Sequence, residues 1–196
     1  MIQPSTPAEA APGTAPQADL WKPVLLRAVA ALMFGALTVF WASPSVAVMG
    51  WSGGIYLLAT GLLLIWSIPK AGYRNDAMPG RIFSAAGSAL TGSGVALILL
   101  HGDLLFGVIA AAGLGVAGAV EVYCGIRYRG RHVLARDWLA SGIIGIGTAA
   151  ALPFFIGLGA HALLGVAGGG AIISGVLWML SGLTLRHDAK PAAGKP

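Results

Sequence analysis

Glu121 is the only acidic residue of this chain that stands well inside a long apolar stretch. Residues 104–126 around it carry no other charged side chain. A charged group at the centre of a membrane helix costs on the order of 3 kcal/mol to insert, and such groups usually face other helices, where they pair or relay protons. Glu121 is therefore a candidate for either of two chemistries: an intramembrane ion pair, or a site that takes up and releases a proton.

Arg27 is the cation best placed to pair with Glu121. It stands four residues inside the apolar stretch 23–41, and Glu121 stands five residues before the end of its own stretch. At a rise of about 1.5 Å per helical residue, both lie at similar depth if they start from the same membrane surface. In the alternative arrangement Glu121 stays protonated or reaches toward the surface, while Arg27 anchors its helix in the headgroups.

His101, Asp103 and His161 form a second candidate group. They stand in short connections between apolar stretches, on the side opposite the arginine clusters. A histidine with a pKa near 6.5 changes its charge in mild acid. These residues are candidates for an outside-facing, pH-sensitive cap, and the alternative is that they are solvated turn residues. His132 and His187 fall on the basic side.

No motif of an enzyme or a metal site occurs in the chain. It has one cysteine, Cys124, and it lacks an H-E-x-x-H pair, a G-x-S-x-G elbow and a G-x-x-x-x-G-K-[ST] loop. We therefore expect a non-enzymatic protein with no catalytic residues, no metal and no cofactor. No small-molecule substrate is identifiable from the sequence.

Composition places the chain in a lipid bilayer. Hydrophobic residues make up 57% of it and charged residues 10%, and the mean hydropathy is +0.81. Such a chain has too few polar residues to cover a water-facing surface. Although the net charge is +5, the basic residues stand in short clusters at the ends of apolar stretches, which argues against a nucleic-acid partner.

Six stretches are long enough to cross the bilayer, whose core of about 30 Å needs about 20 helical residues. Lipid offers the backbone no hydrogen-bond partners, so these stretches must be helices and the fold class is all-α. Three connections are only a few residues long (42–45, 101–103 and 157–161), which predicts three tight antiparallel helical hairpins in tandem. The predicted helices are Pro23 to Trp41, Val46 to Ile68, Ile82 to Leu100, Leu104 to Ile126, Trp138 to Ile156 and Ala162 to Leu185.

The basic residues orient these helices. All twelve lysines and arginines fall on one side of the six-helix arrangement. Because basic residues in short loops resist translocation, that side is expected in the cytoplasm, together with both termini. The predicted organisation is a disordered cytoplasmic tail (1–20), a transmembrane domain (21–187) with hairpin repeats at about 23–68, 82–126 and 138–185, and a second cytoplasmic tail (188–196). Trp21 and Trp138 begin helices on the basic side, which predicts positions in the interfacial aromatic belt.

Glycines repeat along the chain. Gly61, Gly118 and Gly175 stand 57 residues apart, as do Gly54, Ala111 and Gly168. Small residues let membrane helices approach closely, and they also leave faces on which a homo-oligomer could pack. Close helix contacts are expected at small residues spaced four apart: Gly50 and Gly54, Ser88 and Gly92, Ala111 and Gly115, and Gly165 and Gly169.

Three segments resemble the HdeD family of small bacterial acid-resistance membrane proteins. They are Leu25-Leu26-Arg27 through Phe34-Gly35 to Phe40-Trp41, Gly54-Ile55-Tyr56 to Gly61, and Glu121 to Gly125-Ile126-Arg127. The resemblance, which covers residues 21–187, implies an inner-membrane protein linked to acid or envelope stress, with no catalytic residues to carry across. A small channel or transporter with a proton-linked Glu121 is the alternative.

Overall fold

The computed structural model describes residues 19–74 and 78–189, and these fold into six α-helices and one 3₁₀ helix. The predicted tails therefore lie largely outside the described residues. No strand occurs within the described ranges, and six helices are long and apolar enough to cross a membrane. The all-α prediction is confirmed, and the chain is a multi-pass membrane protein. The helices are α1 (Trp21–Phe40), α2 (Val46–Lys70), α3 (Met78–Leu99), α4 (Asp103–Arg127), α5 (Ala135–Ala151), η2 (Leu152–Leu158) and α6 (Ala160–Asp188).

Local sequence sets the helix ends. The Ser45 hydroxyl caps α2 by accepting a hydrogen bond from the Val48 amide at 3.2 Å. The fifth predicted helix differs from expectation: its α-helical part ends at Ala151 and continues as the 3₁₀ helix η2. Pro153 lies near the start of η2 and has no N–H for another α-helical bond. Gly159, with φ +83°, is the single residue between η2 and α6, and glycine adopts this conformation without steric cost.

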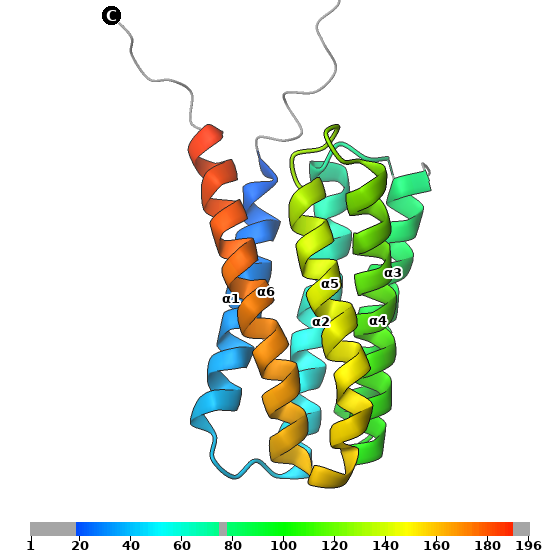
Figure 1. Cartoon of the computed structure of the whole chain (residues 1–196), viewed down its shortest axis with the longest axis vertical. Coiled ribbons are helices and arrows are strands. Elements are labelled where there is room, and N and C mark those ends of the chain that lie inside the picture. The colour runs from blue at the N-terminus through cyan, green and yellow to red at the C-terminus, as the bar shows by residue number, and fades with distance from the viewer. Residues whose placement is uncertain (1–18, 75–77, 190–196) are drawn as a thin grey trace, which may run out of the picture.

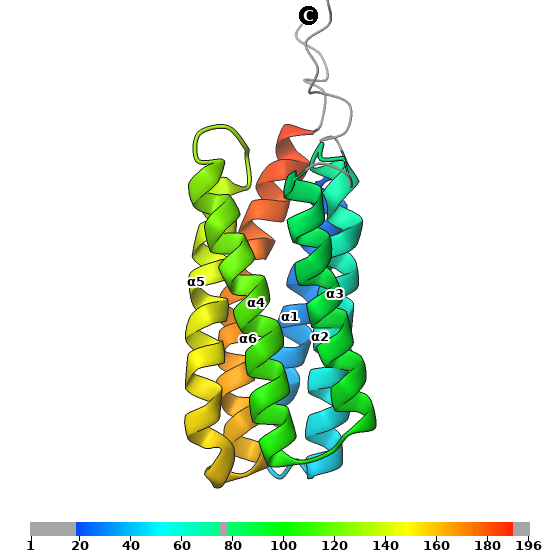
Figure 2. The ribbon, with the colours of Figure 1, turned by 90° about the vertical axis from the view of Figure 1, so that its right-hand side faces the viewer.

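The six helices form a closed ring in which α1 lies beside α6 (Figure 1). The first and last described helices have their free ends at the same end of the bundle, as a second view also shows (Figure 2). We call this the basic end, because the described lysines and arginines lie at or near it. The opposite end, with the short connections 41–45, 100–102 and Gly159, is the hairpin end.

The closest helix packing lies across three seams: α2 with α3, α4 with α5, and α1 with α6. The short loops do join antiparallel neighbours, but the predicted hairpin partners are not the tightest pairs. The three predicted tandem hairpins are therefore present, and the structure adds that the closest packing lies between hairpins. Each hairpin instead packs most closely against the next one, and the third closes onto the first.

Glycines explain why the seams are tight. A Cβ on Gly61 would lie 2.6 Å from the Gly87 carbonyl oxygen across the α2–α3 seam. A Cβ on Gly118 would lie 2.8 Å from the Gly142 oxygen across α4–α5, and one on Gly175 would meet the side chain of Leu32 on α1 at 2.9 Å. The 57-residue repeat therefore marks positions where successive hairpins approach closely.

The predicted pairs of small residues mark close helix contacts less reliably than the 57-residue repeat does. Gly50 and Gly54 do approach α3, but Gly92, Gly165 and Gly169 would each accept a Cβ with nothing within 4 Å. Spacing of four residues occurs on every face of a glycine-rich helix, so it does not identify the face that packs.

Candidate functional site

Arg27 and Glu121, the two charged residues singled out by the sequence, meet inside the bundle. Each lies six residues from the basic end of its helix, α1 or α4. Arg27 Nη2 is 2.5 Å from Glu121 Oε1, and the side chains are 14% and 2% exposed. The contact is an ion pair whose geometry falls short of a hydrogen bond, since Oε1 accepts none. Because α1 and α4 do not share a seam, the pair joins two separate hairpins across the interior.

Ser141 and Trp178 complete the surroundings of the pair. The Ser141 hydroxyl on α5 donates a 2.5 Å hydrogen bond to Glu121 Oε2. The Arg27 guanidinium lies 4.6 Å from the centre of the Trp178 ring on α6, within cation–π range. The carboxylate therefore has a cation on one oxygen and a hydroxyl on the other, and the cation has an aromatic face. Four different helices supply this cluster, which we call the Arg27–Glu121 site.

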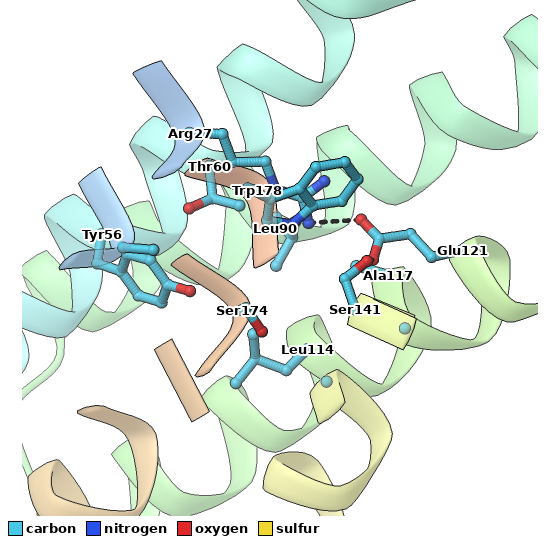
Figure 3. Close-up of a pocket in the computed structure, with 13 residues that line it drawn as sticks. Arg27, Tyr56, Thr60, Leu90, Leu114, Ala117, Glu121, Ser141, Ser174 and Trp178 are labelled. Atoms are coloured by element: carbon cyan, nitrogen blue, oxygen red, sulfur yellow. Dashed lines mark hydrogen bonds and ion pairs between the residues drawn. The ribbon is translucent and has the colours of Figure 1, made fainter. Parts of the chain in front are cut away.

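A cavity of about 40 Å³ adjoins the Arg27–Glu121 site, and all six α-helices line it. A space of this size holds about two or three waters. Two buried polar atoms at its wall, Thr60 Oγ1 and Trp178 Nε1, make no hydrogen bond within the described chain. Tyr56 and Thr60 lie across the cavity from Glu121 and Ser141 (Figure 3). The site can therefore hold an ion pair and a small amount of water.

The site breaks the repeat that builds the rest of the bundle. Leu64, Glu121 and Trp178 stand 57 residues apart, at equivalent positions of α2, α4 and α6, and all three are buried. The same backbone position thus carries an aliphatic, an acidic and an aromatic side chain. The charge is confined to one of three equivalent places.

The histidines of the predicted outer cap lie at the hairpin end without forming one cluster. His101 packs against α2, where a Cβ on Gly50 would meet its ring at 2.8 Å, and His161 is exposed in the first turn of α6. Asp103 begins α4, and a Cβ on Gly159 would lie 4.0 Å from its Oδ2. No hydrogen bond or ion pair joins these three residues within the described ranges.

His132 is partly buried and makes specific contacts that the sequence did not indicate. It lies in the α4–α5 connection, where Nδ1 accepts a hydrogen bond from the Leu134 amide and Nε2 lies 3.2 Å from the Ala71 carbonyl oxygen after α2. This pattern fits the neutral ring with a proton on Nε2. Its ring stacks on Trp138 at 4.5 Å and on Tyr73 at 5.4 Å. Burial lowers the pKa of His132, so the fold favours the neutral form.

Sequence reasoning missed Ser141 and Trp178 at the site and misplaced Trp138. Trp138 is 4% exposed and packs on Phe83 and His132, so its predicted position in the interfacial belt is wrong. One signal was available for Trp178, which stands one repeat after Glu121. A serine in an apolar helix gives no such signal, because it usually bonds to its own backbone.

The described residues hold no group of three or more His, Cys, Asp or Glu side chains placed to bind a metal ion. The side chains gathered at the Arg27–Glu121 site suit charge pairing and hydrogen bonding. No family model, curated protein or solved structure matches this chain.

Proposed function

We propose that this protein is a non-enzymatic inner-membrane protein that contributes to acid or envelope stress tolerance in a bacterial cell. The resemblance to the HdeD family supplies the physiological part of the proposal. The observation that carries the physical part is the enclosed Arg27–Glu121 pair, because it ties α1 to α4 and so holds the first hairpin to the second. The protein then acts as a rigid component of the membrane.

The energetics of a buried ion pair favour this structural role. Removing one partner of such a pair costs about 3–5 kcal/mol, because the other charge is left without compensation. Glu121 is held on both oxygens, by Arg27 and by Ser141. A proton carrier would have to break these contacts in each cycle.

The distribution of charge supports the orientation in the membrane. The basic end carries the described lysines and arginines, and basic residues near membrane helices are retained in the cytoplasm. We therefore assign the basic end and both termini to the cytoplasm, and the hairpin end with His101, Asp103 and His161 to the outside.

A small proton-linked channel or transporter is the second candidate, and the cavity is the observation that favours it. Arg27 and Trp178 line both this cavity and a second void of about 10 Å³ nearer the basic end. The unpartnered Thr60 and Trp178 atoms are suited to hold waters that would extend a proton path from Glu121.

Acid-shock survival separates the two candidates. A deletion strain would carry wild type, Glu121→Gln, Ser141→Ala or empty vector, with the membrane level of each protein measured. Glu121→Gln keeps the shape of the side chain and removes its proton exchange, while Ser141→Ala removes one hydrogen bond and keeps the carboxylate.

We expect equal rescue by wild type and by Glu121→Gln when the two proteins are at equal abundance, because the amide keeps the shape of the side chain and its hydrogen bond with Ser141. The unpaired Arg27 charge should appear as a lower membrane level of the variant. Failure of Glu121→Gln at normal abundance, with rescue by Ser141→Ala, would favour the proton-linked candidate. Absence of rescue by wild type would contradict the role in acid tolerance.

A further inference from the structure

A groove runs between α4 and α5 at the basic end of the bundle. It has a volume of about 220 Å³, with Arg129 and Arg136 at its head and Leu139, Ala140 and Ile143 along its floor. We propose that this groove binds an anionic phospholipid. The two guanidinium groups hold the phosphate, and one acyl chain covers the apolar floor.

The head of the groove is suited to a phosphate. Arg129 lies in the connection after α4, Arg136 is the second residue of α5, and both are exposed. The salt bridges within the described ranges involve other cations, Lys22 and Arg27, so neither Arg129 nor Arg136 forms one there. The neighbouring Asp137 carboxylate attracts Arg136 without a salt-bridge contact. Guanidinium groups match phosphate oxygens with paired hydrogen bonds.

The only acidic residue near this head in the sequence is Asp137, which follows Arg136. It is partly buried in the first turn of α5, where a negative charge stabilises the helix N-terminus. The exposed charge at the groove is therefore positive.

The floor of the groove is suited to a lipid chain. Gly125 of α4 lies directly on α5, where a Cβ would be 2.7 Å from the Leu139 amide nitrogen, so α4 has no side chain at that point to fill the groove. Ile143 is 59% exposed and stands about 12 Å along α5 from its first residue. A free phosphate ion would use the arginines and leave this apolar surface uncovered, and for this reason we commit to the lipid as the ligand.

The other two seams lack the same pair of arginines. When the α2–α3 and α4–α5 seams are aligned on their facing glycines, Gly61–Gly87 and Gly118–Gly142, Arg81 corresponds to Arg136. Gly72 then stands in place of Arg129. At α1–α6, Arg186 corresponds to Arg129, and Lys22, the second residue of α1, corresponds to Arg136. Arg186 lies 5.3 Å from the Trp21 ring, and Lys22 is paired with Asp19 at 2.7 Å. Arg81 and Arg186 are therefore matched controls at the same end of the same fold. The inference does not depend on the proposed role in acid tolerance. The proposed orientation adds only that the groove faces the cytoplasmic leaflet.

Native mass spectrometry of the full-length protein in detergent tests the site. Phosphatidylglycerol is titrated against wild type, Arg129→Gln/Arg136→Gln and the control Arg81→Gln/Arg186→Gln, with phosphatidylcholine as the neutral lipid. Each arginine near an anionic headgroup strengthens binding about fivefold, so the groove variant should bind phosphatidylglycerol about 25-fold more weakly. The control variant should bind as wild type does. Equal weakening in both variants, or equal binding of phosphatidylcholine by wild type, would overturn the proposal.

Two further arms test the lipid chain and guard against misfolding. Ala140→Phe fills the floor and leaves both arginines in place, and we expect it to weaken phosphatidylglycerol binding at least fivefold with an unchanged melting temperature. Inorganic phosphate at millimolar concentration should leave the bound lipid in place. Unchanged lipid binding by Ala140→Phe, or displacement of the lipid by phosphate alone, would show that no acyl chain is recognised.

Discussion

The α2–α3 and α4–α5 seams have the same backbone packing and different polar contents. Gly61 faces Gly87 in one, and Gly118 faces Gly142 in the other. When the two seams are aligned on these glycine pairs, Leu64 corresponds to Glu121 and Ala86 corresponds to Ser141. Glu121 and Ser141 are hydrogen-bonded to each other, whereas Leu64 and Ala86 have no polar side chain. Both seams are tight, so the polar pair is not needed to bring two hairpins together.

This difference indicates that the glycines and the charged residues have different structural roles. The repeated glycines assemble the ring, and the charged residues add a connection that the repeat does not supply, from α4 to Arg27 on α1. A buried ion pair contributes little net stability over an apolar replacement and can still define which helices meet. Variants that affect one role and not the other test this separation.

Charge reversal at the Arg27–Glu121 site should have the largest effect. Glu121→Arg places two guanidinium groups together in the interior, and we expect a loss of at least about 3–5 kcal/mol in the free energy of unfolding. Membrane abundance and thermal unfolding in detergent would measure it. The swap Arg27→Glu/Glu121→Arg should recover part of the loss, and a swap no better than the single variant would contradict the pairing.

Ser141→Ala should have the next largest effect, because it leaves Glu121 Oε2 without its hydrogen bond. A hydrogen bond to a charged group contributes about 1.5–3 kcal/mol. The matched control is Ala86→Ser on α3. The position equivalent to Glu121 is Leu64 there, so the new hydroxyl meets no carboxylate and should not raise the stability. A Ser141→Ala protein that melts as wild type does would remove Ser141 from the site.

Alanine at the seam glycines should affect both seams alike. Gly61→Ala and Gly118→Ala each place a methyl group against the facing backbone, at a cost of about 1–3 kcal/mol. Gly92→Ala and Gly147→Ala are the matched controls on α3 and α5, because nothing lies within 4 Å of a Cβ there. Thermal unfolding should separate the two sets, and equal melting of all four variants would contradict the seam assignment.

Acid should weaken the basic end through His132, with a smaller effect. Burial lowers its pKa in the folded protein below the ordinary value of 6.5, so below about pH 6.5 the unfolded chain binds more protons than the folded one. Stability should fall as the pH drops from about 6.5 to the folded-state pKa, and change no further through this group below it.

Melting temperatures of wild type and His132→Phe between pH 8 and pH 5 would measure this effect. The phenylalanine keeps a ring for stacking and cannot be protonated, so its melting temperature should depend less on pH than that of wild type. Parallel curves for the two proteins would exclude His132 as the cause. His187→Phe at an exposed position is the control.

Much of the fold could be predicted from the sequence because lipid imposes simple rules. Hydropathy and length define the six helices, and the depth of Glu121 and Arg27 in their helices was enough to suggest that the two could meet. Helix pairing was harder to predict: glycines occur on several faces, and only the structure identifies Gly87 and Gly142 as partners of the repeated glycines.

The contacts of Ser141 and His132 could not be predicted from the sequence for a related reason. Ser141 looks like other helical serines until Glu121 is placed beside it. His132 lies in a chain segment rich in arginine, which suggested an exposed loop, and its burial depends on Ala71 and Trp138 from other parts of the chain. Such contacts depend on the tertiary arrangement.

A double-mutant cycle between Arg27 and Glu121 tests most directly whether the pair connects α1 and α4. The free energies of unfolding of wild type, Arg27→Met, Glu121→Leu and the double variant would be measured in one detergent. We expect each single variant to lose about 3–5 kcal/mol, and the double variant, which makes this position resemble Leu64 of α2, to be nearly as stable as wild type. Additive losses in the double variant would show that the two residues act independently and would contradict the account.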